Sequence, residues 1–371
     1  GPTISGITTY SGRHFFVPPQ GDTASRPSDC EPGSLRFNTD TAHLEYFRGN
    51  TIGWTEIEAE LTAPLGGGTG SNTGLGTRMV LMGGTDGSGV VDVIQFITIS
   101  TLGNAQDFGN LTAAKQEGAA ATNHLRGIYF GGDPALNIIE FVTFSSTGNA
   151  QDFGDLLNGA KSGTSMSDRT RGVLQLGGTT ANILEYVTFA QTGNAVDFGD
   201  MLTGGSAGSG FSSSTRGVYA IGSNNANYKN IIEFITISTT GNGTDFGDLS
   251  GLYIHRNAYS NATRGVFHSG YQYPASPNFS NNIEFVTIAT TGNTVDFGDS
   301  LLGGFGCGGS SPTRGVAGGG YYANSPTGET AGFTNIIDFI EIATTGNSVD
   351  FGDTINVVRH IKGGSNGHGG L

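Results

Sequence analysis

The sequence predicts an all-β protein whose larger part is a six-bladed β-propeller. The first observation is a repeat whose final Asp-Phe-Gly begins at Asp107, Asp152, Asp197, Asp245, Asp296 and Asp350, a period of 45 to 54 residues. The second is the arginine that opens each copy, at Arg78, Arg126, Arg171, Arg216, Arg264 and Arg314. The third is that no segment keeps an apolar period of 3.6 residues over 11 or more residues. A repeat of this length without helical patterning is typical of small sheets repeated radially.

The repeat is clearest between residues 214 and 249. Its run at residues 231–237 is short, β-branched and aromatic, which favours a strand. Because five of these seven residues are large and apolar, we expect both faces of the strand to be covered. Thr-Gly-Asn and Asp-Phe-Gly-Asp are interpreted as turns between strands. Each repeat is therefore predicted to be an antiparallel sheet of about four strands.

Residues 1–60 are predicted to form a separate arm and small β-meander, which precedes a propeller spanning residues 61–371. One strand of the arm is expected at residues 14–17. In the meander, Leu35 and Phe37 alternate with polar residues, as do Leu44 and Tyr46, and a third strand is expected at residues 54–57. A meander of about 30 residues is too small to be very stable alone.

The tail at residues 354–365 matches the stretch that in other copies leads towards the next Arg-Gly. It has no further copy to enter. We predict that it lies beside the start of the first repeat, near Arg78, because sharing strands between the two ends removes open sheet edges.

The repeat resembles the kelch repeat in a divergent form. An apolar strand ends in a glycine pair in four copies, as at Gly83-Gly84, and an aromatic residue follows in a later strand, as at Phe234. A phenylalanine such as Phe246 stands where kelch repeats have a late tryptophan. Two copies depart from the pattern, since Gly222 and Gly270 are single glycines. The resemblance implies a β-propeller.

Residues 32–57 resemble small modules of tailed-phage fibre and virion proteins. The shared pattern is a Gly-x-Leu-Arg-Phe-Asn-Thr hairpin followed by a Gly-Trp strand. The Thr-Thr-Gly-Asn…Asp-Phe-Gly-Asp turns of the repeats resemble those of repeat-bearing virion proteins of marine tailed phages. The resemblance implies a virion structural or fibre protein, located on the surface of an extracellular particle.

The composition excludes several kinds of partner. The 17 basic and 31 acidic residues give a net charge of −14, which argues against nucleic acid, because binding it requires basic patches. The same charge argues against adhesion to anionic membranes. No apolar run is long enough to span a bilayer, so no membrane insertion is predicted.

The sequence carries no pattern typical of an enzyme or a metal site. Cys30 and Cys307 stand far apart without a CxxC motif, and two free thiols are favoured over a bond between them. The seven histidines form neither HxxxH nor HExxH, and no nucleophile elbow of the Gly-x-Ser-x-Gly type is evident. Calcium at pairs such as Asp197 and Asp200 is an alternative that lacks the spaced ligands of known calcium loops. We predict no catalysis, no cofactor and no metal.

The repeated arginines have two interpretations. In the first, they form bonds to carboxylates that lock neighbouring blades together. The carboxylates available at equivalent positions are Glu140, Glu185, Glu233, Glu284 and Asp338, with Gln95 in the first repeat. In the second, the arginines form a ring of cations around a channel that binds an anion. The first interpretation is preferred.

The loops that follow the glycine positions differ most between repeats. Those of repeats four to six are rich in aromatic residues, and equivalent loops of a propeller emerge on one face. Tyr, Asn, Ser and Gly together make adaptable recognition surfaces. Subunit packing and simple loop drift are the alternatives. The candidate ligand-binding residues are Tyr228, Tyr271, Tyr273, Phe279, Tyr321 and Tyr322.

The sequence therefore predicts a phage tail-fibre or appendage protein whose propeller binds a host-surface glycan or protein, with many copies on one particle giving avidity. Residues 1–60 are expected to attach it to other virion proteins or to its own copies, as a homo-oligomer for which a trimer is favoured. A purely structural decoration or fibre-shaft protein is the main alternative, with the loop aromatics buried between subunits. A glycan-cleaving enzyme is a further alternative, and it needs two carboxylates about 5–10 Å apart in a cleft.

Overall fold

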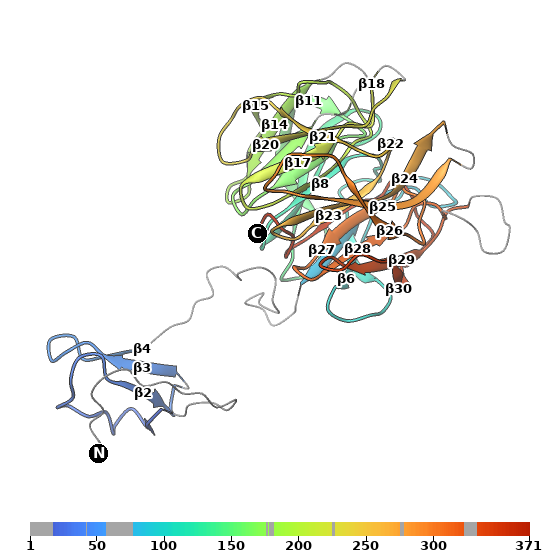
Figure 1. Cartoon of the computed structure of the whole chain (residues 1–371). Helices are drawn as coiled ribbons and strands as arrows, with labels where there is room; N and C mark the ends of the chain where they lie inside the picture. Colours follow the sequence, from blue (N-terminus) through green and yellow to red (C-terminus); the bar gives the residue numbers. More distant parts are fainter. Residues whose placement is uncertain are drawn as a thin grey trace. The chain divides into compact units, whose positions relative to one another are not determined.

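The computed structural model describes residues 18–41, 43–56, 77–175, 177, 182–224, 227–274, 278–322 and 332–371. All helices and strands assigned within these residues are β-strands, so the predicted all-β class is confirmed. No helix that could cross a bilayer occurs in this part of the chain. The chain divides into two compact units, Gly1–Thr62 and Ala63–Leu371 (Figure 1). The strand expected at residues 14–17 lies outside the described residues.

The first unit contains a four-stranded sheet in the order β1-β2-β3-β4. The three predicted strands of the meander are present, and a short parallel strand precedes them. The strands are β1 (Gln20–Gly21), β2 (Leu35–Asn38), β3 (His43–Phe47) and β4 (Trp54–Glu56).

Polar side chains occupy the buried face of this small sheet. Arg36, Asn38 and Glu45 are almost fully buried. The Glu45 carboxylate accepts hydrogen bonds from Arg26 and from the Asn38 amide. These bonds hold the pKa of Glu45 below its usual value, although burial alone would raise it. The interior of the first unit is thus a hydrogen-bonded network.

The apolar side chains of the same strands lie on the opposite face. Leu35 pairs with Tyr46, and Phe37 pairs with Leu44, so the four share one side of the sheet. Leu35 is 48% exposed and the other three are half-buried. The first unit therefore presents an apolar surface that its own chain leaves partly uncovered.

In the part of the second unit that the structure describes, six sheets share a core of four antiparallel strands, and one of them has a fifth strand. The first sheet is β31 (Lys362–Ser365), β5 (Arg78–Met82), β6 (Val93–Thr98) and β7 (Gln106–Asn110). The second is β8 (Ala119–Thr122), β9 (Arg126–Phe130), β10 (Leu136–Thr143) and β11 (Gln151–Ala160), and the third is β12 (Thr164–Ser167), β13 (Arg171–Gln175), β14 (Ile183–Thr188) and β15 (Val196–Asp200).

The last three sheets repeat this arrangement. The fourth is β16 (Ser209–Ser212), β17 (Arg216–Ala220), β20 (Ile231–Thr236) and β21 (Thr244–Asp248), and the fifth is β23 (Asn257–Ser260), β24 (Arg264–Tyr273), β25 (Phe279–Thr287) and β26 (Val295–Asp299). The sixth is β27 (Cys307–Ser310), β28 (Arg314–Gly318), β29 (Ile336–Glu341) and β30 (Val349–Asp353). A ribbon of β18 (Ser223–Asn224) and β19 (Asn227–Tyr228) follows β17, and β22 (Leu252–Ile254) adds a fifth strand beside β24.

The C-terminal tail lies where the sequence predicts. Its strand β31 pairs with β5, placing Ser365 opposite Met79 and Lys362 opposite Met82. The first sheet is therefore built from both ends of the second unit, and its other three strands come from the first repeat.

The Asp-Phe-Gly motif forms a strand, so the turn predicted for it is wrong. It lies inside the fourth strand of every sheet, for example at residues 152–154 of β11. Its glycine has a φ of +143° to +151° in all six copies, and the ladder to the third strand shifts register beside it. The glycine therefore lies in a β-bulge within the strand. Residue type alone does not distinguish such a bulge from a turn, because both favour glycine.

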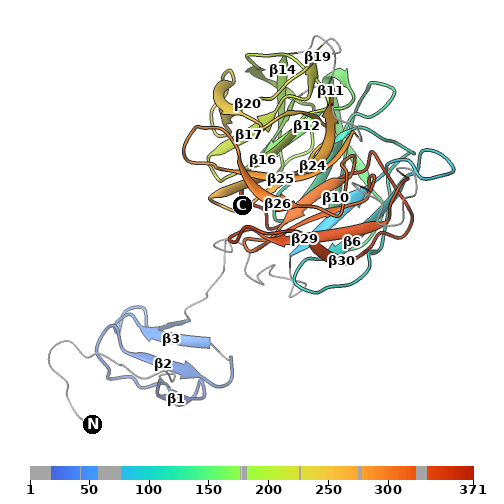
Figure 2. The ribbon, with the colours of Figure 1, turned by 45° about the vertical axis from the view of Figure 1, so that its right-hand side comes forward.

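The hydrophobic core consists of six clusters, and each lies between two consecutive sheets. One cluster joins Met79 and Leu81 of the first sheet to Val316 and Phe351 of the sixth. In both ribbon views, β29 and β30 in red lie beside β6 in cyan (Figures 1 and 2). Since burying one such side chain contributes about 1.5–3 kcal/mol, every sheet is held mainly by its two neighbours.

Candidate functional site

The arginines that open the repeats link each sheet to the next through backbone carbonyl oxygens and not through carboxylates, although Arg314 also forms an ion pair with Glu341 of its own sheet. Arg78 donates from Nη1 to the Phe144 carbonyl oxygen at 2.8 Å, and its guanidinium lies 4.6 Å over the Phe96 ring of its own sheet. The other five do the same, with Arg126 donating to Phe189, Arg171 to Ile237, Arg216 to Ile288, Arg264 to Ile342 and Arg314 to Ile99.

The predicted arginine–carboxylate pairing is therefore wrong, and strand geometry explains why. In the fourth sheet Arg216 pairs with Thr236, whereas Glu233 pairs with Tyr219, three residues further along. Three residues span about 10 Å of a strand and place the two side chains on opposite faces. The same register recurs in the other sheets, so no repeat brings its arginine to its own acid.

The repeated acids link each sheet to the preceding one. Glu233 accepts hydrogen bonds from the backbone N–H groups of Leu202 and Thr203, at 3.0 and 2.9 Å. Each equivalent side chain accepts from a backbone N–H, with Gln95 bonded to Ile355, Glu140 to Thr112, Glu185 to Leu157, Glu284 to Ser250 and Asp338 to Leu301. All six are almost fully buried, so they serve the joints between sheets.

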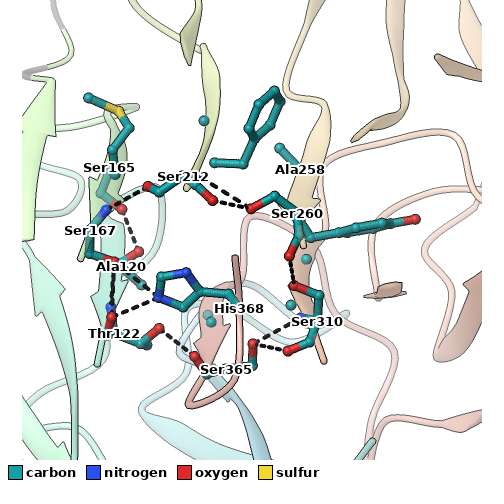
Figure 3. Close-up of a pocket in the computed structure, with 18 residues that line it drawn as sticks. Ala120, Thr122, Ser165, Ser167, Ser212, Ala258, Ser260, Ser310, Ser365 and His368 are labelled. Atoms are coloured by element: carbon teal, nitrogen blue, oxygen red, sulfur yellow. Dashed lines mark hydrogen bonds between the residues drawn. The ribbon is translucent and has the colours of Figure 1, made fainter. Parts of the chain in front are cut away.

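One strand of each sheet contacts the corresponding strands of its two neighbours, and we call these six the innermost strands: β31, β8, β12, β16, β23 and β27. A hydroxyl-bearing residue lies at the end of each innermost strand. We call these six residues the hydroxyl ring: Thr122, Ser167, Ser212, Ser260, Ser310 and Ser365. Each is hydrogen-bonded to the next through a hydroxyl group, and the sixth is bonded to the first, where Thr122 donates to the Ser365 carbonyl oxygen at 2.8 Å. Figure 3 shows this cycle around a pocket.

His368 lies within the hydroxyl ring (Figure 3). Its Nε2 is 2.9 Å from the Thr122 carbonyl oxygen, and its Nδ1 accepts the Gly370 N–H at 3.1 Å. These contacts require the neutral ring with its proton on Nε2. Burial lowers the pKa of His368 to about 4, in keeping with a neutral ring. The C-terminal segment around His368 thus lies at the end of the innermost strands that carries the hydroxyl ring.

A second cycle lies just before the innermost strands. We call its members the mouth ring: Glu117, Ser162, Ala207, His255, Phe305 and His360. Each backbone N–H donates to the carbonyl oxygen of the preceding member, and Glu117 donates to His360 at 3.2 Å. All six have a φ between +51° and +65° although none is glycine. Positive φ is uncommon for such residues and marks a position that the surroundings impose.

Five side chains of the mouth ring form one connected group, in which the His360 ring lies 5.0 Å from that of Phe305. The Glu117 carboxylate accepts the Ser162 hydroxyl at 2.6 Å and lies 3.2 Å from His360 Nδ1. The His255 ring stacks on Phe305, with centroids 4.3 Å apart. Burial lowers the pKa of His360 to about 4, and Glu117 opposes that change.

Inside the mouth ring is a polar pocket, which we call the mouth pocket. The volume of this pocket that the centre of a water molecule can reach is about 70 Å³. Residues on the innermost strands of all six sheets line it, Asn257 and Lys362 among them, together with Arg256. Neither this pocket nor the one at the hydroxyl ring is lined by an Asp or a Glu. Its polar lining suits a small hydrogen-bonding ligand.

The predicted ligand-binding residues fall into three places. Tyr271, Phe279 and Tyr321 contact Phe305 of the mouth ring, and we call these four residues the aromatic surface. Tyr228 and Tyr273, the tyrosine pair, stack on each other at 4.7 Å, and Tyr273 is 49% exposed. Tyr322 is half-buried and bridges to Leu302.

Sequence reasoning missed Phe305, His255, His360 and Lys362. They belong to different residue types, so no motif links them. Their one shared signal is position, because each precedes or begins an innermost strand. Within the described residues, no group of three His, Cys, Asp or Glu side chains could hold a metal ion. Cys307 is a buried free thiol and Cys30 a half-buried one.

Comparison with known proteins gives a likeness of fold only. No family model matches the chain, and no curated protein matches it. Solved structures do match, and one of them is described as the structure of YjhT. That match has a TM-score of 0.50 and 10% identity, and it covers 62% of this chain and 82% of the other. At this identity the likeness extends to the all-β fold and not to a ligand or activity.

Proposed function

We propose that the six sheets are the blades of a six-bladed, kelch-like propeller. Two independent cycles of hydrogen bonds support this arrangement, the hydroxyl ring and the mouth ring. Each takes one residue from each repeated unit and returns to its starting sheet. Six sheets joined in such cycles are most simply placed around a common axis.

We further propose that the protein is a binding module of a tailed-phage virion and that its ligand is a host-surface glycan. The observation that carries the proposal is the aromatic surface, which includes Phe305, the residue that precedes Gly306 of the mouth pocket. Aromatic rings offer large, rigid contact areas, and Tyr adds a hydroxyl group at low conformational cost. Next to a polar pocket, such a surface suits a sugar, which has apolar faces and hydroxyl edges.

The buried acids favour binding over cleavage. A glycosidase of the usual kind needs two carboxylates that flank the scissile bond. Here the repeated acids are bonded to backbone N–H groups between sheets, and the two pockets lack carboxylates. We therefore propose a non-enzymatic role.

We propose that the first unit attaches the protein to the particle or to its own copies. The apolar face around Leu35, Phe37, Leu44 and Tyr46 supports this role, because it pairs across two strands and is only partly covered. Multi-angle light scattering of the full chain tests it. We expect an oligomer, with a trimer favoured, that dissociates when Leu35 and Leu44 are both changed to Gln.

A glycan array with the full chain tests the recognition role. We expect binding that is lost in the Tyr271→Ala/Tyr321→Ala double variant, because both rings belong to the aromatic surface. Binding should be weakened in Tyr228→Ala/Tyr273→Ala, because Tyr273 is 49% exposed. The matched control is Leu125→Ala, which removes a side chain that is 67% exposed in the turn between β8 and β9. A wild-type chain that binds no glycan contradicts the proposal. Mass spectrometry of purified particles tests the virion location separately.

A further inference from the structure

The mouth pocket contains a cation without an anionic partner. Lys362 occupies the first position of β31 and lines the pocket. The equivalent positions of the other innermost strands hold Ala119, Thr164, Ser209, Asn257 and Cys307. Within the described residues, the Lys362 ammonium forms no hydrogen bond and no ion pair with a carboxylate, although the residue is half-buried and has lost part of its hydration.

The other charged groups near the pocket are already paired. Arg256 forms an ion pair with Glu284, and both side chains are almost fully buried. The carboxylate that acts on Lys362 most strongly, Glu117, is bonded to Ser162 and His360. Ser162 is uncharged, and the lowered pKa of His360 keeps its ring neutral at pH 7. The charge of Glu117 therefore acts on Lys362 from a distance, and no described carboxylate contacts the ammonium.

Two further polar atoms at the pocket residues lack partners. Asn257 is 1% exposed, and its Oδ1 accepts no hydrogen bond. Arg256 is 6% exposed, and its Nε donates none. Buried polar atoms are almost always paired, so these two residues, which line the same pocket as Lys362, indicate a site that a ligand completes. Arg256 Nε suits an acceptor, whereas Asn257 Oδ1 needs a donor such as a hydroxyl group.

We propose that the mouth pocket binds a carboxylate group, with Lys362 as its counter-ion. A singly charged carboxylate matches the single free cation better than a phosphate, which several donors usually hold. By the same measure of volume, one water molecule needs about 10–15 Å³. The pocket of about 70 Å³ therefore accommodates a carboxylate and the few atoms next to it. The carboxylate belongs either to a small free acid or to an acidic sugar. Only the second case depends on the glycan binding proposed above.

The charged neighbours set the pH dependence of binding. Burial lowers the pKa of Lys362, and Glu117 and Cys307 oppose that change. His255 and His360 also interact electrostatically with Lys362, and the buried Arg256 lines the same pocket. A bound carboxylate favours the charged ammonium, so binding takes up protons and weakens as pH rises through the Lys362 pKa.

Protection from amine acylation, read by mass spectrometry on the full wild-type chain, tests the proposal. Glucuronate, acetate and glucose are the probes. We expect glucuronate to slow the acylation of Lys362 at least tenfold, glucose to have no effect, and the exposed Lys161 to serve as the internal control. Protection by acetate as well assigns the site to small free acids, whereas protection by glucuronate alone assigns it to acidic sugars.

Variants complete the test. In a thermal-shift titration, Lys362→Met should abolish stabilisation by glucuronate, Lys362→Arg should retain it, and Lys161→Met should not change it. Equal protection by glucose, protection by neither acid, or unchanged stabilisation of Lys362→Met overturns the proposal. Tyr273→Ala should leave acetate protection unchanged, so a failure of glycan recognition and a failure of this site are distinguishable.

Discussion

Arg314 Nη1 donates a hydrogen bond to the carbonyl oxygen of Ile99, 3.0 Å away, across a sequence separation of 215 residues. The bond joins the sixth repeat to the first. The same guanidinium lies 4.4 Å over the Phe339 ring of its own sheet. One side chain thus combines a charged hydrogen bond to the neighbouring sheet with a cation–π contact in its own.

Changing Arg314 to Leu should lower the free energy of unfolding by about 1–3 kcal/mol, because a charged hydrogen bond and a cation–π contact are lost. Chemical denaturation of the purified chain measures the effect. Arg314→Lys should recover only part of the loss, since an ammonium lacks the planar fork. The matched control is Glu341→Gln, which removes the half-exposed acid beside Arg314 and should change stability by less than about 1 kcal/mol. Equal effects of Arg314→Leu and Glu341→Gln contradict the role given to the carbonyl bond.

Two glycines in contact across a sheet boundary should respond differently to Ala. A Cβ on Gly154 would lie 2.4 Å from the Gly193 carbonyl oxygen, and the φ of Gly154 is +149°. A Cβ on Gly193 would meet nothing within 4 Å. Gly154→Ala should therefore cost about 2 kcal/mol or more, and Gly193→Ala about 0.5 kcal/mol or less. Melting temperatures of the two variants decide, and similar values would disprove the close approach at Gly154.

Glu185 and Glu284 occupy equivalent positions but should differ in their tolerance of Gln. Glu185 has no cationic partner, and burial raises its pKa. Burial alone would raise the pKa of Glu284 too, but the Arg256 charge brings it below its usual value. At pH 7, Glu185→Gln should change stability by about 1 kcal/mol or less, because Gln95 already accepts the equivalent bond. Glu284→Gln should cost about 3–5 kcal/mol, because it leaves Arg256 unpaired.

The pH dependence of the two variants should have opposite signs. Because the pKa of Glu185 is raised in the folded chain, its contribution to wild-type stability falls as pH rises. The stability of Glu185→Gln should therefore increase relative to that of the wild type between pH 4 and pH 8. A lowered pKa gives Glu284 its full stabilising effect above its unfolded pKa of about 4.5, so the loss of stability in Glu284→Gln should be constant above about pH 5.5 and should shrink as pH falls towards 4. Denaturation midpoints measured between pH 4 and pH 8 provide the readout. Plots of midpoint against pH that run parallel for the two variants would refute the opposite pKa shifts of Glu185 and Glu284.

His368 should make the wild type sensitive to acid. Its pKa is about 4 in the folded chain and about 6.5 in an unfolded one, so the unfolded state binds more protons between these values. Wild-type stability should fall as pH falls from 6.5 to 4. His368→Gln should melt lower than wild type at pH 7, but the difference should shrink towards pH 4. His255 and His360 titrate in both proteins and cancel in this comparison. A constant difference would contradict a buried neutral His368.

The repeats were readable from sequence because their signals are local. The period, the strand content and the tail beside Arg78 follow from spacing and residue type, and the pairs between β5 and β31 confirm the tail. The partners of Arg216 and Glu233 were not readable, because they depend on the strand register and on the backbone of neighbouring sheets. The Asp-Phe-Gly strand was misread as a turn, because a glycine with positive φ serves both.

The sequence by itself determined an all-β chain with six similar units and a small N-terminal sheet, since period, β-propensity and turn residues act within one repeat. The tertiary structure alone decided the candidate site. Phe305, His360 and Lys362 share no motif and come together because the innermost strands converge. It also decided that no carboxylate among the described residues pairs with Lys362, because charge pairing depends on distance in space and the nearby acids bond to other groups.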